Sequence, residues 1–258
     1  MRRRLFIPAL IALLVAAWAT NSFAETAQNG NLRVTFNADF APHVLPRTQP
    51  APVKVEVQGR ISTTDGSHPP PLRWLELKIN RNGKFYSKGL PVCTAPTLQS
   101  TSSETALARC RPALVGRGSF HAEVKLGREI PASGKILAFN SSRAGKPALL
   151  LHLFAGAPVR FTLVVPLTIG HLSHGQFGTV LRAKIPRLGG DLGSVTEIDL
   201  TIGRQFSSGG KRRSYVSAAC SAPPDLNEAL FPFARAGFRF EGHKGFEETL
   251  LRICRVAS

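Results

Sequence analysis

Apolar and polar residues alternate along much of this chain. The alternation has a period of two in five segments, at residues 53–58, 75–80, 120–126, 198–202 and 238–241. This period is typical of a half-buried β-strand, because successive side chains of a strand point to opposite faces. Such strands must pack against a second layer that covers their apolar face. The pattern therefore predicts an all-β fold.

Two further segments, 148–154 and 161–167, are apolar at nearly every position. Short runs of this kind indicate central strands with little solvent contact on either face. One short helix is expected at 102–111, where Ser102 or Ser103 can cap the first turn.

Turn signals separate the predicted strands. The Asn82-Gly83 pair predicts a tight hairpin after the strand at 75–79, because both residues tolerate positive φ. The three prolines that follow His68, at 69–71, are stiff and extended. They predict a spacer between two strands.

About a dozen strands follow from these patterns, which is more than a minimal immunoglobulin-like sandwich contains. We expect an antiparallel β-sandwich stapled by disulfides, with one short helix. One large sandwich and two immunoglobulin-like sandwiches joined near residues 127–134 both fit the sequence. The central strands follow that junction and suit the middle of a shared core, so we favour one domain over residues 25–258.

The N-terminus predicts export. Arg2, Arg3 and Arg4 precede an apolar run at 5–19, and small residues at the end of this region lead to Ala24. This order is typical of a secretory signal peptide at residues 1–24, cleaved near Ala24. No later apolar run approaches the roughly 18 residues of a membrane helix. We expect a secreted or extracytoplasmic protein whose mature chain has no transmembrane anchor.

The four cysteines are expected to pair in an oxidising compartment. Three connectivities are possible, and pairing of sequence neighbours is favoured: Cys93 with Cys110, and Cys220 with Cys254. Redox or zinc chemistry fits poorly, because the sequence has no Cys-x-x-Cys pair and no histidine at ligand spacing from a cysteine. The sequence predicts structural disulfides, no metal site and no cofactor.

Charge points to one class of partner. The formal net charge is +17, and 30 basic residues against 16 acidic ones remain once the three arginines of the predicted signal peptide are removed. An anionic envelope polymer or surface is one expected partner. The basic residues are scattered, however, which is also typical of a solvated surface. Specific recognition of nucleic acid is not predicted.

The densest basic cluster is a candidate binding loop. Lys211, Arg212 and Arg213 follow two glycines, and Tyr215 lies two residues further on. Such a loop can grip phosphate or carboxylate groups. A polar hairpin tip without a ligand is the alternative interpretation.

Three residues are weak candidates for catalysis. Glu197 and Asp199 project from one face of a predicted strand, as in one family of retaining β-glucanases, but Ile202 occupies the place of the third acidic residue. His152 lies within an apolar run, where a hydrogen-bonded core histidine is more common than a catalyst. The sequence also lacks the Gly-x-Ser-x-Gly elbow of serine hydrolases and any phosphate-binding glycine loop.

Several segments together resemble a group of secreted actinobacterial proteins that has no established function. The similarity is carried by residues 89–93, 110–116, 145–152, 193–203 and 214–220. The resemblance implies a bacterial exported protein, but it transfers no activity and no site residues.

We therefore expect a non-enzymatic β-sandwich protein of the cell envelope or medium, acting as a structural or ligand-binding module. A carbohydrate-active hydrolase that uses Glu197 or Asp199 is one alternative. An anionic-polymer-binding protein that uses the Lys211–Arg213 loop is another. No feature of the sequence predicts an oligomeric state.

Overall fold

The computed structural model describes residues 24–188, 192–243 and 245–257. Apart from Ala24, the predicted signal peptide lies outside the described residues. The all-β class is confirmed, because 62% of the described residues are in strands and 7% are in helices. None of the helices in the described ranges is long and apolar enough to span a membrane.

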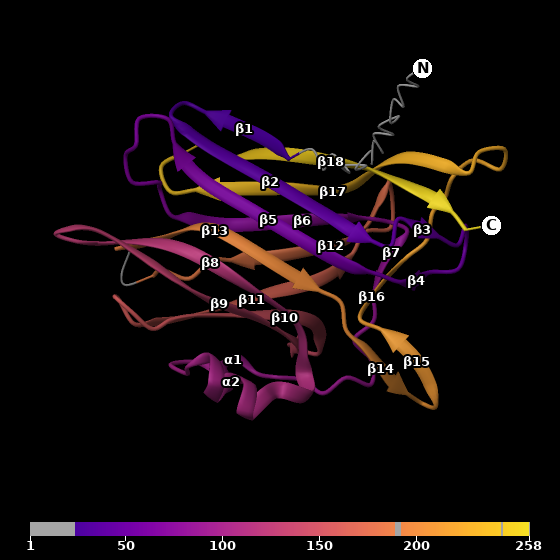
Figure 1. Cartoon of the computed structure of the whole chain (residues 1–258), viewed down its shortest axis with the longest axis horizontal. Helices are drawn as coiled ribbons and strands as arrows, with labels where there is room; N and C mark the ends of the chain where they lie inside the picture. Colours follow the sequence, from indigo (N-terminus) through magenta and orange to yellow (C-terminus); the bar gives the residue numbers. More distant parts are fainter. Residues whose placement is uncertain (1–23, 189–191, 244, 258) are drawn as a thin grey trace, which may run out of the picture.

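Within the described residues, thirteen strands form one large sheet, antiparallel except where β18 meets β3 (Figure 1). In spatial order the strands are β1 (Glu25–Asn29), β2 (Leu32–Ala41), β5 (Lys54–Thr63), β13 (Gly193–Ile202), β8 (Leu114–Leu126), β9 (Arg128–Arg143), β10 (Lys146–Ala155), β11 (Phe161–His171), β12 (Phe177–Lys184), β6 (Leu72–Asn80), β17 (Glu228–Phe240), β18 (Phe246–Val256) and β3 (Val44–Leu45). Every segment predicted from apolar patterning is a strand of this sheet.

The large sheet curls, so that β1 and β2 at one end lie against β18 near the other end (Figure 1). The ring centroids of Phe36 on β2 and Phe238 on β17 are 5.9 Å apart, and those of Phe40 and Phe233 on the same two strands are 5.2 Å apart. Because β2 and β17 are not neighbours in the sheet, these contacts join opposite walls of the curl. One curled sheet thus supplies both faces of the core.

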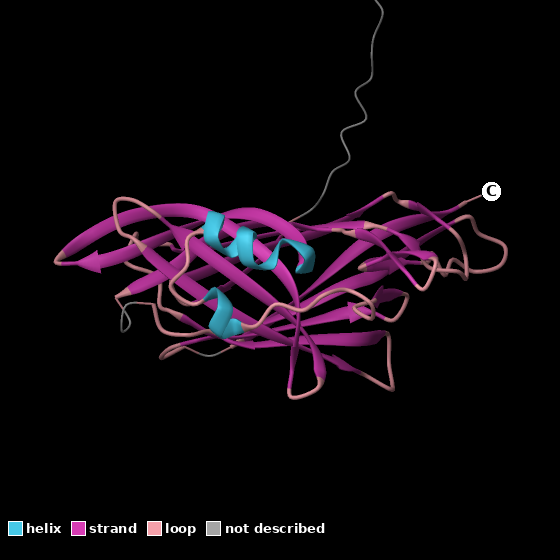
Figure 2. Ribbon diagram, turned by 90° about the horizontal axis from the view of Figure 1, so that it is seen from below, coloured by secondary structure: helices cyan, strands magenta, loops and turns pink. Residues whose placement is uncertain are grey.

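Short helices cover the outer face of the sheet over β9 and β10 (Figure 2). They are α1 (Ala95–Leu98), α2 (Ser103–Cys110) and the 3₁₀ turn η1 (Arg111–Ala113). The predicted cap is confirmed, because the Ser102 hydroxyl accepts a hydrogen bond from the Thr105 amide, 3.2 Å away. Leu98 packs with Phe139 and Leu150 in a second core beneath the helices. This cover explains why the segment at 148–154 is apolar on both faces.

Both favoured disulfides are confirmed. Cys93–Cys110 closes a span of 17 residues around α1 and α2. Cys220–Cys254 closes a span of 34 residues and attaches the segment after β16 (Val216–Ala218) to β18. No free cysteine remains. Two bridges of this kind are consistent with folding in an oxidising compartment.

The prediction of a hairpin at Asn82-Gly83 is wrong. The strand after this turn, β7 (Gly83–Phe85), pairs with β16 instead of β6, and β16 also pairs with β4 (Ala51–Pro52). The reason is that β6 is already paired with β12 on one side and with β17 on the other. No edge of β6 is left for β7.

The possible domain junction at 127–134 is the turn between β8 and β9 and the first part of β9. β5 and β8 precede this turn in the sequence, and β13 follows it. Because β13 pairs with both β5 and β8, strands from before and after the turn belong to the same sheet.

Candidate functional site

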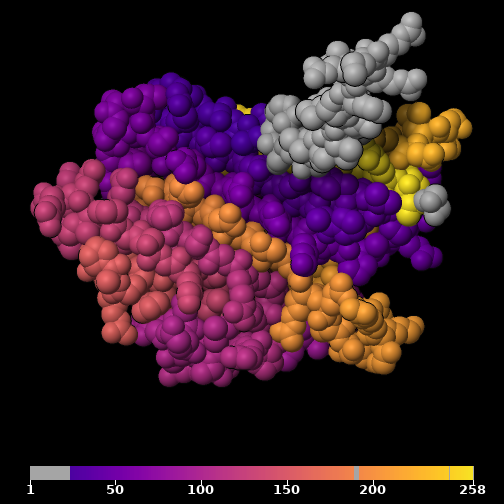
Figure 3. Space-filling model, viewed as in Figure 1, coloured from indigo at the N-terminus to yellow at the C-terminus, as the bar shows by residue number. Residues whose placement is uncertain are grey.

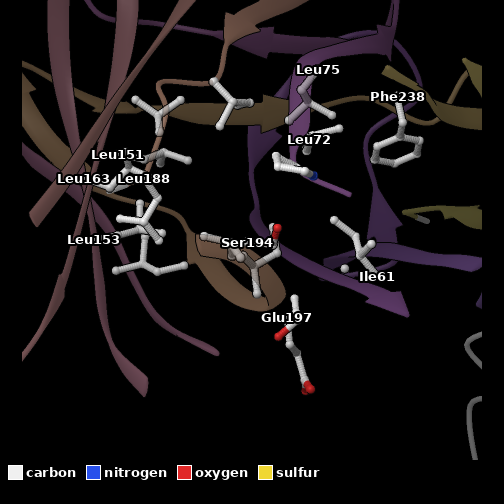
Figure 4. A pocket seen from close by; sticks show the side chains of 18 of the residues that line it. Ile61, Leu72, Leu75, Leu151, Leu153, Leu163, Leu188, Ser194, Glu197 and Phe238 are labelled. Atoms are coloured by element: carbon white, nitrogen blue, oxygen red, sulfur yellow. The ribbon is translucent and has the colours of Figure 1, made fainter. Parts of the chain in front are cut away.

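An apolar cavity of about 140 Å³ lies inside the curl of the large sheet. Leu151 and Leu153 of β10 and Leu163 of β11 lie on one side of it, and Leu75 of β6 and Phe238 of β17 lie on the other (Figure 4). These residues come from the alternating positions that the strand pattern directs inward. The cavity is therefore built from the same side chains that form the core.

The lining side chains leave this space unfilled. Leu75, Leu77 and Leu151 belong to the core, yet each is only partly buried. Protein interiors normally pack as densely as crystals of small organic molecules, so an apolar space of this size is unusual. An apolar cavity of about 150 Å³ stays dry and accepts a molecule such as benzene. The cavity here has room for an apolar ligand of similar cross-section.

A second apolar space of about 50 Å³ adjoins the first. Phe36, Val57 and Leu77 line both spaces. The second space extends along the curl to Phe40 and Phe233. Unfilled apolar space therefore occurs at two successive places along the curl, and a molecule that reached both would be chain-like rather than round.

The charged residues that line the cavity are already paired. Arg60 Nη2 is 2.8 Å from Glu197 Oε2, and Arg73 Nε donates to Glu241 Oε2 over 2.7 Å. The Arg60 side chain is 64% exposed, so this end of the lining faces solvent. Figure 4 shows the Glu197 side chain directed away from the apolar wall. Neither arginine offers an unpaired charge to an anionic ligand.

The acidic pair proposed for catalysis lies on the outer side of β13. Glu197 is held by Arg60, and Asp199 Oδ2 accepts a hydrogen bond from Gln58 Nε2 over 3.2 Å. Both carboxyl groups border a shallow surface depression over β2, β5 and β13. They are thus satisfied by neighbours on the adjacent strand β5.

The third catalytic candidate, His152, lies elsewhere. It is fully buried on β10, and its Nε2 is 3.1 Å from the carbonyl oxygen of Thr101 and 3.0 Å from the Thr101 hydroxyl. Because a carbonyl only accepts hydrogen bonds, Nε2 carries the proton and donates. His152 therefore does not share a cleft with Glu197 and Asp199, and it behaves as a hydrogen-bonded core histidine.

Burial of His152 predicts a loss of stability in mild acid. Burial lowers the pKa of His152 because it penalises the charged ring, and the bond to Thr101 opposes this only in part. In the unfolded chain a histidine titrates near about 6.5. As the pH falls below that value, the unfolded state takes up the proton first. The contribution of His152 is thus complete above about pH 6.5 and is lost as the pH falls through its lowered pKa.

We expect His152→Gln to show less acid destabilisation than the wild type, because glutamine can donate to the Thr101 carbonyl without titrating. Urea unfolding at about pH 7.5 and about pH 5 measures the difference. Equal losses of stability in the two proteins would contradict the assignment.

The predicted binding loop is a two-stranded hairpin formed by β14 (Gln205–Ser208) and β15 (Lys211–Ser214). It protrudes from the body of the molecule (Figure 3). Lys211, Arg212 and Arg213 are exposed, and the Arg213 guanidinium lies 5.0 Å from the centre of the Tyr86 ring. Tyr215 is fully buried, so it is separated from the three basic residues. Anion binding by the hairpin stays a prediction.

One group of described residues could hold a metal ion. His68 of the loop between β5 and β6 lies beside Glu123 of β8 and Glu129 of β9. One donor atom from each side chain lies within 4.8 Å of the other two. Sequence spacing did not suggest this group, because its members are separated by up to 61 residues in the sequence.

The apolar cavity was also missed by sequence reasoning. The alternating pattern identified its lining residues as core, but no local signal shows whether facing side chains meet or leave a gap.

Comparison with known proteins finds no matching family model, no similar curated protein and no similar solved structure.

Proposed function

We propose that this chain is an exported, non-catalytic binding protein that holds an uncharged, elongated apolar molecule inside its curled sheet. The observation that carries the proposal is the unfilled apolar cavity bounded by β6, β10, β11 and β17. Ligand pockets are typically apolar with few polar groups, and this cavity fits that description. An acyl chain or a similar hydrocarbon has the required chemistry.

Paired charges around the cavity favour a neutral ligand. A fatty acid carboxylate would have to compete with Glu197 for Arg60, or with Glu241 for Arg73. Burying a charge without a partner is costly, whereas burying hydrocarbon is favourable by about 0.8 kcal/mol for each methylene group. A neutral lipid or alcohol of the same chain length should bind more tightly than the acid.

The two disulfides and the predicted signal peptide support a place outside the cytoplasm. There a binding protein can shield an apolar compound from water. The separation of His152 from the Glu197–Asp199 pair supports a role without catalysis.

Nile red, an uncharged dye that fluoresces in apolar surroundings, tests the proposal. We expect saturable binding to the wild type and displacement by a long-chain alcohol more readily than by the matching fatty acid. Leu153→Trp and Leu163→Phe add bulk at the cavity wall. Each should weaken dye binding by about tenfold or more, which corresponds to about 1.4 kcal/mol.

Two controls locate the site. Leu230→Trp makes the same change as Leu153→Trp at a side chain that is 64% exposed, and it should bind like the wild type. The triple variant Lys211→Gln, Arg212→Gln, Arg213→Gln should also bind like the wild type. Overpacking typically costs about 1–3 kcal/mol, so cooperative unfolding of each variant must be verified. Full dye binding by both folded cavity variants would reject the proposal, and loss in the triple variant would move the site to the hairpin.

A further inference from the structure

A histidine and two glutamates converge where the loop between β5 and β6 meets the β8–β9 hairpin. His68 Nδ1 lies 3.3 Å from Glu123 Oε2 and 3.7 Å from Glu129 Oε1. Donor atoms bound to one zinc ion at about 2.0–2.2 Å in a tetrahedral arrangement are about 3.3–3.6 Å apart. The spacing around His68 is therefore close to that of a shared metal ion.

His68 Nδ1 lies close to both carboxylates but makes no hydrogen bond to either of them. Its side chain is 18% exposed, and Nδ1 is enclosed and makes no hydrogen bond. The 3.3 Å approach to Glu123 thus lacks the alignment of a hydrogen bond. A nitrogen and an oxygen that bind the same metal ion lie close together, but both point at the ion and so are not aligned for a hydrogen bond to each other. Simple ion pairing of a protonated His68 is the competing account.

The surrounding fold holds the three side chains in place. Ser194 of β13 is only 4% exposed, and its hydroxyl donates to the Pro69 carbonyl over 3.0 Å. Ser194 is also the register partner of Glu123 across the β13–β8 ladder. The buried Ser194 hydroxyl thus holds Pro69, which follows His68 in the chain, close to Glu123. The stiff prolines after His68 restrict the loop further.

We propose that His68, Glu123 and Glu129 bind a first-row transition-metal dication of the zinc type. An imidazole nitrogen suits zinc, cobalt or nickel, whereas calcium and magnesium prefer oxygen ligands alone. The two carboxylates balance the charge of the ion. Three protein ligands leave a fourth position for water. The ion ties the 64–71 loop to the β8–β9 hairpin, and the site is independent of the apolar ligand.

Isothermal titration of untagged, EDTA-treated, disulfide-intact protein with Zn²⁺ tests this site. We expect one ion per chain, no competition from excess Ca²⁺ or Mg²⁺, and a visible absorption band of four-coordinate Co²⁺ when that metal is used instead. His68→Ala and Glu123→Gln should each bind at least about tenfold more weakly, because losing even an outer-shell partner of a ligand costs that much. Zn²⁺ should raise the melting temperature of the wild type but not of His68→Ala.

Two variants serve as matched controls. His43→Ala removes another histidine that lies beside a carboxylate, with Nε2 3.4 Å from Asp39, and it should bind Zn²⁺ like the wild type. Lys125→Gln removes a positive charge opposite Glu129 in the β8–β9 ladder, and it should bind at least as tightly as the wild type. Absence of saturable Zn²⁺ binding in the wild type would overturn the site. Unchanged affinity in both ligand variants would do the same.

Discussion

Replacing Cys220 and Cys254 together by alanine is expected to lower the free energy of unfolding by about 4 kcal/mol. The bridge closes a span of 34 residues, so its loss restores much conformational freedom to the unfolded chain. Both cysteines are buried in the main core, and the bridge holds the segment after β16 against β18. Alanine is preferred to serine here, because it introduces no hydroxyl into apolar surroundings.

The second disulfide provides the control for this result. Cys93→Ala with Cys110→Ala opens a span of only 17 residues, for which the same relation gives about 3 kcal/mol. Urea unfolding of the two double variants beside the wild type measures both losses. A loss below about 1 kcal/mol for the Cys220–Cys254 variant would show that the bridge does not constrain the unfolded chain as expected.

A single methyl group added at Gly134 is expected to cost about 3 kcal/mol of stability, near the upper end of the usual range for overpacking. Gly134 lies on β9, between Phe120 of β8 and Ala155 of β10. A Cβ atom at this position would lie 2.0 Å from the Phe154 carbonyl oxygen and 2.8 Å from the Phe120 ring. The first of these contacts is with backbone, so β10 itself would have to shift.

Ser133→Ala is the control for Gly134→Ala. Ser133 is the preceding residue on the same strand and is exposed, so its replacement should change stability by less than about 0.5 kcal/mol. Thermal and urea unfolding of the two variants give the comparison. If Gly134→Ala were as stable as Ser133→Ala, the close approach of β9 and β10 would not need a glycine.

The sequence by itself determined the local structure. Period-two alternation identified five of the strands, because the two faces of a strand meet different surroundings whichever strand lies beside it. The Ser102 cap and the pairing of cysteines close in sequence were also predictable, since both depend on residues near one another in the chain. The apolar run at 148–154 indicated a strand buried on both faces, and the structure shows the helices that cover it.

Only the tertiary structure decided how these elements meet. The pairing of β7 with β16 followed from the neighbours of β6, which no turn signal reveals. Tyr215 is buried although basic residues precede it, and the convergence of His68 with Glu123 and Glu129 depends on β13 lying beside β8. The cavity exists because the leucines of β10 and β6 do not fill the space that the curl leaves between these two strands. Such features arise from contacts between distant parts of the chain, and alternation along one strand carries no information about the opposite wall.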